Sequence, residues 1–217
     1  LISNYDTQFI LGDPPNYEPG REDSISALAK TKGTSELEVI YDEFMKNGGT
    51  NLVYACFTPY ENHKLDFVER FYGLKSTVAG GSDGGAHCGS ICDGSFTTHM
   101  LTHWTRDRSR GKKLELPWVV KAHCQDTAAA VGLNDRGVLA PGYKADINII
   151  DLGKMRLKKP EVHYDLPAGG RRLMQFADGY VAPLVSGVPI YLNGESTGAR
   201  PGRLVRGSQP KPNLRNY

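Results

Sequence analysis

Apolar residues recur at helical spacing in the first part of the chain, and this pattern predicts two helices. The first runs from about Ser24 to Lys32, and Gly33 closes it because glycine readily adopts the left-handed conformation that ends many helices. The second begins at Ser35, where Glu38 completes a capping-box pattern. Its apolar positions are Leu37, Ile40, Tyr41 and Phe44.

Two continuous apolar runs follow, and each predicts a strand that is buried on both faces. The first covers residues 51–57, and the second ends near Gly81. A helix between them extends from about Asn62 to Gly73, with its apolar residues at helical spacing. Because helices and buried strands alternate, the sequence predicts parallel β/α units with right-handed crossovers.

The pattern changes from helices to short strands near Gly137. Helices are expected over 95–108 and 117–130. Strands are expected after them over 145–150, 181–185 and 188–192, the last two forming a hairpin around Ser186-Gly187. The expected fold class is therefore α/β. Its parts are a β/α region over 1–136, a small β domain over 137–207 and a mobile tail over 208–217.

Composition narrows the class of protein. With 217 residues, 39% of them hydrophobic, the chain can bury a real core, and its net charge of +2 gives no reason to expect nucleic acid as a partner. No apolar run approaches the ~18 residues of a membrane span. The four cysteines are too scattered for a disulfide scaffold, so reduced thiols and a cytoplasmic location are expected. The chain begins with Leu1 rather than Met, which suggests a fragment.

The candidate chemistry centres on Ser82-Asp83-Gly84, which follows the second apolar run. A carboxylate at the carboxyl end of a buried strand occupies the place where parallel α/β enzymes keep catalytic groups. The alternative is that Asp83 only caps a helix. His87 and Cys88 lie on the same predicted loop and are candidates, with Ser82, for contacting a substrate; the alternatives are an exposed loop histidine and a small filler.

Other candidates have a structural interpretation that is simpler than the functional one. His99 and His103 are four residues apart on a predicted helix, so they share a face and have the spacing of a metal pair. No third ligand at a sensible spacing accompanies them, which favours surface or packing histidines. The basic run of Arg106, Arg108 and Arg110 is interpreted as a solvated charged surface.

Three motifs together resemble the amidohydrolase superfamily. They are Ser82-Asp83-Gly84, the segment 127–133, and Gly137-x-Leu139-x-Pro141-Gly142-x-x-Ala145-Asp146-Ile147. The final Gly198-Ala199-Arg200-Pro201-Gly202-Arg203 is similar to the N-acyl-D-amino-acid deacylase branch. The likeness covers nearly all of this chain but only the carboxyl-terminal portion of such an enzyme.

The resemblance implies the carboxyl-terminal part of a metal-dependent (β/α)8 barrel followed by a small β-sandwich-type domain. The strand around Val53 would be the seventh of the barrel and the strand around Val78 the eighth. Asp83 would be the proton-transfer base and a possible metal ligand, with one or two divalent metals, zinc in type, in the complete enzyme. No His-x-His occurs in the sequence, so the remaining ligands are expected upstream of Leu1.

The implied activity is hydrolysis of a C–N amide bond other than a peptide bond, on a small acyl-amide such as an N-acyl-D-amino acid. The family's arginine after the Asp-Gly is replaced by the segment Ile91-Cys92-Asp93, which keeps a cyclic-amide hydrolase as an alternative. The fragment alone is expected to be inactive, and a non-catalytic piece that only folds or oligomerises is the second alternative. A homo-oligomer, or the amino-terminal portion of the same protein, is the expected protein partner, with no nucleic acid and no membrane.

Overall fold

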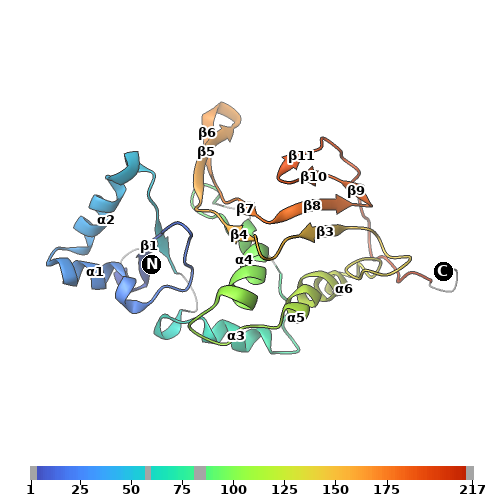
Figure 1. Ribbon diagram of the computed structural model, residues 1–217, viewed down its shortest axis with the longest axis horizontal. Helices are drawn as coiled ribbons and strands as arrows, with labels where there is room; N and C mark the ends of the chain where they lie inside the picture. The colour runs from blue at the N-terminus through green and yellow to red at the C-terminus, as the bar shows by residue number, and fades with distance from the viewer. Residues whose placement is uncertain (1–3, 57–59, 81–86, 214–217) are drawn as a thin grey trace.

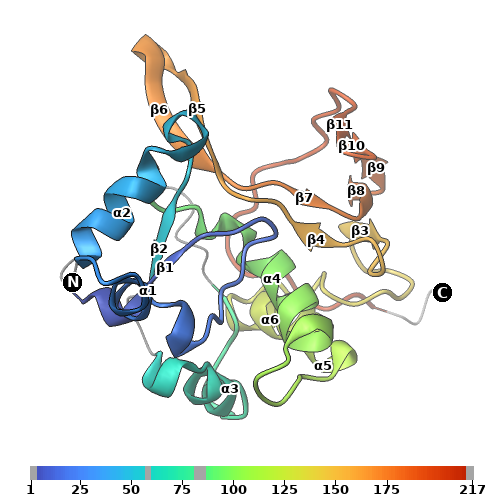
Figure 2. The same ribbon diagram turned by 60° about the vertical axis from the view of Figure 1, so that its left-hand side comes forward.

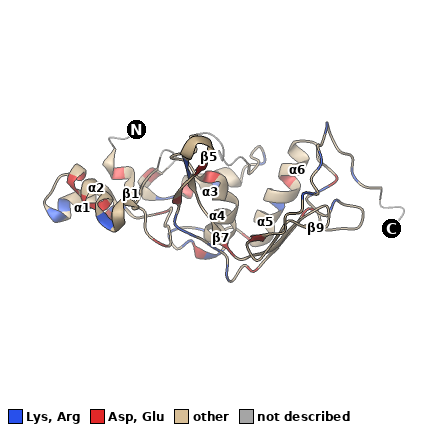
Figure 3. Cartoon of the chain, turned by 90° about the horizontal axis from the view of Figure 1, so that it is seen from above, with Lys and Arg blue, Asp and Glu red and all other residues tan. Residues whose placement is uncertain are grey.

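The structure is a computed structural model that describes residues 4–56, 60–80 and 87–213. A helical hairpin lies at one end, helices α3 to α6 form the middle, and most strands of the carboxyl-terminal region lie beside these helices (Figure 1). Residues of both charge signs are spread along the chain (Figure 3), in keeping with its small net charge of +2. No helix within the described ranges is long and apolar enough to cross a membrane.

The first two predicted helices are confirmed. Helix α1 spans Ile25–Lys32, with the Ser24 hydroxyl accepting a hydrogen bond from the Ala27 amide and Gly33 ending it at φ 67°. Helix α2 spans Glu36–Phe44 and has the predicted reciprocal capping box. The two helices pack through buried residues that form a small core, namely Ile25, Ala29 and Val39.

The strand around Val53 exists, but its predicted parallel, doubly buried setting is wrong. Strand β2 (Val53–Ala55) is half-buried and pairs antiparallel with β1 (Gln8–Ile10). The backbone amide of Cys56 continues this pairing by donating to the Thr7 carbonyl. The apolar run at 51–57 therefore pairs with a distant segment whose sequence is irregular. The periodicity of the sequence does not reveal this pairing.

The second predicted strand does not form in its described part. Residues 77–80 have no strand neighbour, and the Thr77 amide instead donates to the carbonyl of Leu74 in a turn. A strand needs a partner for its backbone groups, and none of the described segments supplies one here. Gly81 and the Ser82-Asp83-Gly84 motif lie outside the described residues.

The remaining helices form the middle of the molecule. They are α3 (Asp66–Tyr72), α4 (Phe96–Thr102), α5 (Leu116–Lys121) and α6 (Thr127–Ala130). Wide helical turns at 103–107 and 122–126 continue α4 and α5, so the two predicted long helices are confirmed with local distortions. Helix α3 begins later than the expected Asn62, because Asn62 has φ 52° and belongs to a separate short turn.

A second core holds these helices together. Met100, Trp104 and Val119 are buried in it, and the ring of Tyr72 meets the indole of Trp104 edge-on at 5.5 Å between centroids. This core supports the carboxyl-terminal end of α4, where the polar groups described below are placed.

The predicted strands over 145–150 and 181–185 are confirmed to within two residues, whereas the predicted strand over 188–192 is divided into two short strands in different sheets. Strands β3 (Ile147–Ile150), β8 (Tyr180–Val185) and β9 (Val188–Pro189) form one antiparallel sheet in the order β3-β8-β9. Ser186 at φ 52° and Gly187 at φ 80° make the predicted hairpin turn. A second short hairpin joins β10 (Tyr191–Leu192) to β11 (Glu195–Ser196).

Four further strands were not predicted. Strand β4 (Arg156–Leu157) pairs with β7 (Ala177–Asp178), and β5 (Glu161–Leu166) pairs with β6 (Gly170–Met174) as a hairpin that projects from the body (Figures 1 and 2). Near the end of the chain, Gln209 exchanges backbone hydrogen bonds with Gly132 and Asn134.

Candidate functional site

The described part of the predicted active-site loop begins at His87. His87 has φ 49°, and its carbonyl accepts hydrogen bonds from the amides of Ser90 and Ile91, which makes a tight turn. The His87 residue is exposed and Cys88 is half-buried. Ser82 and Asp83, the other two predicted site residues, lie outside the described residues, so the helix-cap alternative for Asp83 is also untested.

The segment from Cys88 to Ser95 is anchored on the end of β6. The Leu173 amide donates to the Cys88 carbonyl over 2.6 Å, and the Ser95 hydroxyl donates to the Gln175 side-chain carbonyl over 2.5 Å. The Gln175 amide group in turn donates to the Tyr17 hydroxyl over 2.7 Å. One glutamine of the β region therefore joins the segment that follows Asp83 to the amino-terminal loop.

The Cys92 thiol of this segment is not a reactive one. Burial, reinforced by the neighbouring Asp93 carboxylate, raises the pKa of Cys92 to about 11. The thiol stays protonated near neutral pH, and only the thiolate is a good nucleophile. All four cysteines are free, as expected for reduced thiols.

A buried ion pair lies beside this region. Glu18 is 2% exposed and Arg108 is 1% exposed, and the guanidinium holds the carboxylate through two hydrogen bonds of 2.9 Å each. The His103 ring donates to the same carboxylate over 2.9 Å, and the Leu65 amide does so over 2.8 Å. Burial alone would raise the pKa of Glu18, but these donors hold the pKa well below its usual range.

This arrangement corrects the interpretation of the basic run. Arg108 is buried rather than solvated, because its guanidinium lies 4.6 Å above the Trp104 ring and also bonds Asp66 over 2.7 Å. Arg106 is half-buried and is held by Asp107 and by backbone carbonyls of the β region. His103 packs against Glu18, which agrees with the packing interpretation of this histidine.

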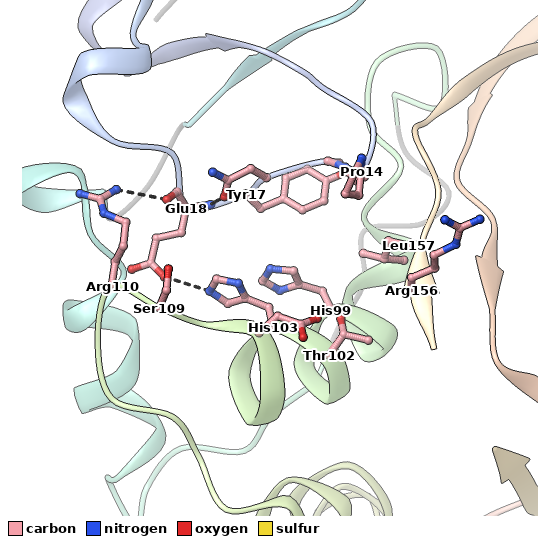
Figure 4. A pocket seen from close by; sticks show the side chains of 13 residues that line it. Pro14, Tyr17, Glu18, His99, Thr102, His103, Ser109, Arg110, Arg156 and Leu157 are labelled. Atoms are coloured by element: carbon pink, nitrogen blue, oxygen red, sulfur yellow. Dashed lines mark hydrogen bonds and ion pairs between the residues drawn. The ribbon is translucent and has the colours of Figure 1, made fainter. Parts of the chain in front are cut away.

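A pocket of about 380 Å³ lies next to the ion pair (Figure 4). Three parts of the chain line it: the loop 14–18, the helical segment 99–110 and strand β4. The rings of His99 and His103 stack on one another, 4.7 Å apart between centroids, and the Tyr17 ring meets His99 edge-on at 5.6 Å. Burial, aided by the adjacent His103, lowers the pKa of His99 to about 3, so His99 is neutral at physiological pH.

The ring nitrogens of the two histidines differ in their partners. The Nε2 atom of His103 is bonded to Glu18, and the buried Nε2 atom of His99 has no hydrogen-bond partner in the described part of the chain. Within the same part, no group of three or more His, Cys, Asp or Glu side chains is placed to hold a metal ion.

Sequence reasoning missed Glu18, Tyr17 and Gln175. Glu18 lies in an irregular, proline-containing loop and meets Arg108 across 90 positions of sequence, so no local spacing marks the pair. The one sequence feature of Glu18 is that it follows a tyrosine in a segment without periodicity. Such a pair of neighbouring residues is too common to indicate a buried ion pair.

Comparison with known protein families shows to which family the chain belongs. The Amidohydrolase family model matches residues 21–191, which is most of the chain and includes the Ser82-Asp83-Gly84 motif. The chain belongs to the amidohydrolase family. No curated protein matches it.

Three solved structures resemble this amidohydrolase chain over 88% of its length. A crystal structure of D-aminoacylase has 21% sequence identity and a TM-score of 0.45. A D-aminoacylase mutant in complex with copper chloride has 20% sequence identity and a TM-score of 0.43. A D-aminoacylase studied for its binuclear metal centre has 22% sequence identity and a TM-score of 0.44. The chain spans only 36% of the length of each of these proteins.

Proposed function

We propose that this chain is the carboxyl-terminal part of a metal-dependent hydrolase that cleaves an amide C–N bond, with Asp83 as its proton-transfer base. The observation that carries the proposal is the family match over residues 21–191, which encloses both Asp83 and the Gly137-to-Ile147 signature. The proposed substrate is a small acyl-amide of the N-acyl-D-amino-acid type, in line with the Gly198-to-Arg203 motif. Ser82, His87 and Cys88 are proposed to contact it.

The chemistry explains why a carboxylate is needed. When water attacks the amide carbonyl, the new C–O bond forms as the water loses a proton, and Asp83 accepts it. The C–N bond then breaks, and the same proton passes from Asp83 to the leaving nitrogen, because an amide anion is a poor leaving group. Asp83 ends the cycle ionised and can accept a proton from the next water molecule.

One or two divalent metal ions, zinc in type, are part of the proposal for the complete enzyme. Among the described residues, no group of three or more His, Cys, Asp or Glu side chains is placed to hold such an ion. We also propose that the chain is divided into a β/α region and a β domain. A cytoplasmic location and a homo-oligomer are proposed as well.

A substrate comparison tests this function. The longer enzyme to which the chain is proposed to belong is incubated with N-acetyl-D-amino acids, their L-enantiomers and five- and six-membered cyclic amides. We expect release of the free D-amino acid and much slower turnover of the other two classes. Preferential opening of the cyclic amides would replace the substrate assignment, and no hydrolysis of any C–N bond would overturn the proposed function.

A further inference from the structure

We propose that the pocket between loop 14–18, the segment 99–110 and β4 binds a small molecule that carries a carboxylate on an apolar body, with Arg110 as its principal anchor. The proposal does not depend on the reaction proposed above. It rests on the charges that line the pocket, on the apolar surfaces beside them and on the size of the space.

Each of the two carboxylates that line the pocket is paired with an arginine. Glu18 is held by Arg108 and His103. Both oxygens of Asp107 accept hydrogen bonds from the guanidinium of Arg106, over 2.6 and 2.8 Å. Each lining acid is therefore paired with a guanidinium, although Arg108 is shared with Asp66, which does not line the pocket.

Arg110 carries a positive charge that no carboxylate of the described chain balances by an ion pair. It is half-buried, its Nη1 atom donates to the backbone carbonyl of Glu18 over 3.1 Å, and its side chain also donates to the Tyr60 hydroxyl. A guanidinium has five N–H donors, and two of them in parallel match the oxygens of a carboxylate. A partly buried cation with spare donors is a natural anion anchor, because the reduced dielectric strengthens its attraction for an anion.

Arg156 lies at the opposite end of the pocket from Arg110 (Figure 4). Its Nε atom donates to Asp178 over 2.9 Å, and the Arg156 side chain is 67% exposed. Because that charge is paired and solvated, Arg156 contributes less than Arg110 to holding an anion.

The surfaces between the two arginines suit an apolar body. Pro14, the buried Leu157 and the rings of Tyr17 and His99, which meet edge-on, supply this apolar surface (Figure 4). His99 is neutral, so this surface adds no second cation that would favour a multiply charged inorganic anion. The volume of about 380 Å³ falls within the range of sites for small organic ligands.

Calorimetric titration with a pair of isosteric probes tests the proposal. Benzoate and benzamide have the same ring and nearly the same shape, but only benzoate carries a charge. We expect benzoate to bind the 217-residue chain at least tenfold more tightly than benzamide. We expect Arg110→Gln to remove this difference, Arg110→Lys to retain part of it, and Arg156→Gln to have the smaller effect.

The controls separate a specific site from general attraction. Arg203→Gln removes an exposed arginine near the end of the β region, outside the lining of the pocket, and should leave benzoate binding unchanged. Thermal unfolding of each variant checks that it is folded, and Arg110→Lys provides a second variant in case Arg110→Gln does not fold. Equal binding of benzoate and benzamide, full benzoate binding by Arg110→Gln, or inorganic phosphate binding more tightly than benzoate would each overturn the proposal.

Discussion

Arg108 holds Glu18 through two hydrogen bonds of 2.9 Å, and both residues are almost completely buried. The pair joins the amino-terminal loop to the end of α4, two segments separated by 90 positions. Taking two charges out of water is costly, and the cost is offset here because the Glu18 carboxylate receives further donors from His103 and Leu65. Breaking one side of such a pair leaves a buried charge without its partner.

Glu18→Gln should therefore lower the free energy of unfolding by roughly 3–5 kcal/mol, the range for removing one member of a buried ion pair. Urea unfolding followed by circular dichroism measures this change. Glu61→Gln, which alters an exposed glutamate, is the matched control and should change the free energy by less than about 0.5 kcal/mol. A loss below about 1 kcal/mol for Glu18→Gln would show that the pair does not hold these segments together.

Stability should fall in acid, and His99 should account for the first part of the fall. The folded pKa of His99 is about 3, against about 6.5 for an ordinary histidine. Below about pH 6.5 the unfolded chain binds a proton that the folded chain does not, so stability falls by up to about 1.4 kcal/mol per pH unit. We expect His99→Gln to flatten the stability profile between pH 6 and 4.5, with denaturant unfolding at each pH as the measurement. An unchanged slope in this variant would contradict the assigned protonation state.

Glu18 should act at lower pH. Its pKa in the folded chain is depressed, so its stabilisation is complete above the ordinary glutamate pKa of about 4.3 and is lost as pH falls below that value. In Glu18→Gln this additional loss below about pH 4.5 should disappear, while the His99 contribution at higher pH remains. A steep loss below pH 4.5 that persists in Glu18→Gln would assign the acid sensitivity to other carboxylates.

Gln175 should control the mobility of the segment that follows Asp83. Gln175→Ala removes the acceptor of Ser95 and the donor to Tyr17 at once, and should cost about 1–3 kcal/mol through unsatisfied groups. Amide hydrogen exchange over residues 88–95 is expected to become faster, with little change in α1 and α2. Gln125→Ala, at an exposed glutamine, is the control. Unaltered exchange over 88–95 would mean that backbone contacts such as that between Leu173 and Cys88 suffice.

The features that sequence reasoning predicted correctly depend on local signals. The Ser35 and Glu38 capping box, the Gly33 helix end and the Ser186-Gly187 turn are each determined by residues a few positions apart. Their backbone conformations follow from the residues themselves.

The features that sequence reasoning missed depend on contacts between distant segments. The pairing of β1 with β2, the burial of Arg108 against Glu18 and the junction at Gln175 join residues that lie about 45 to 158 positions apart. An apolar run shows that a strand will be covered, but it does not show which strand covers it or in which direction. The same holds for an arginine, because burial depends on a carboxylate that only the fold brings near.

The most direct test of the proposed hydrolase is the turnover of Asp83→Asn in the longer enzyme, assayed by release of the free amine from an N-acetyl-D-amino acid. Asparagine keeps the size of the side chain but does not accept the proton from water, so kcat should fall by at least a factor of about 10². Circular dichroism should be unchanged, and Asp42→Asn, at an exposed aspartate of α2, should retain full activity. Near-normal kcat in Asp83→Asn, with the fold intact, would contradict the role of Asp83 as the proton-transfer base.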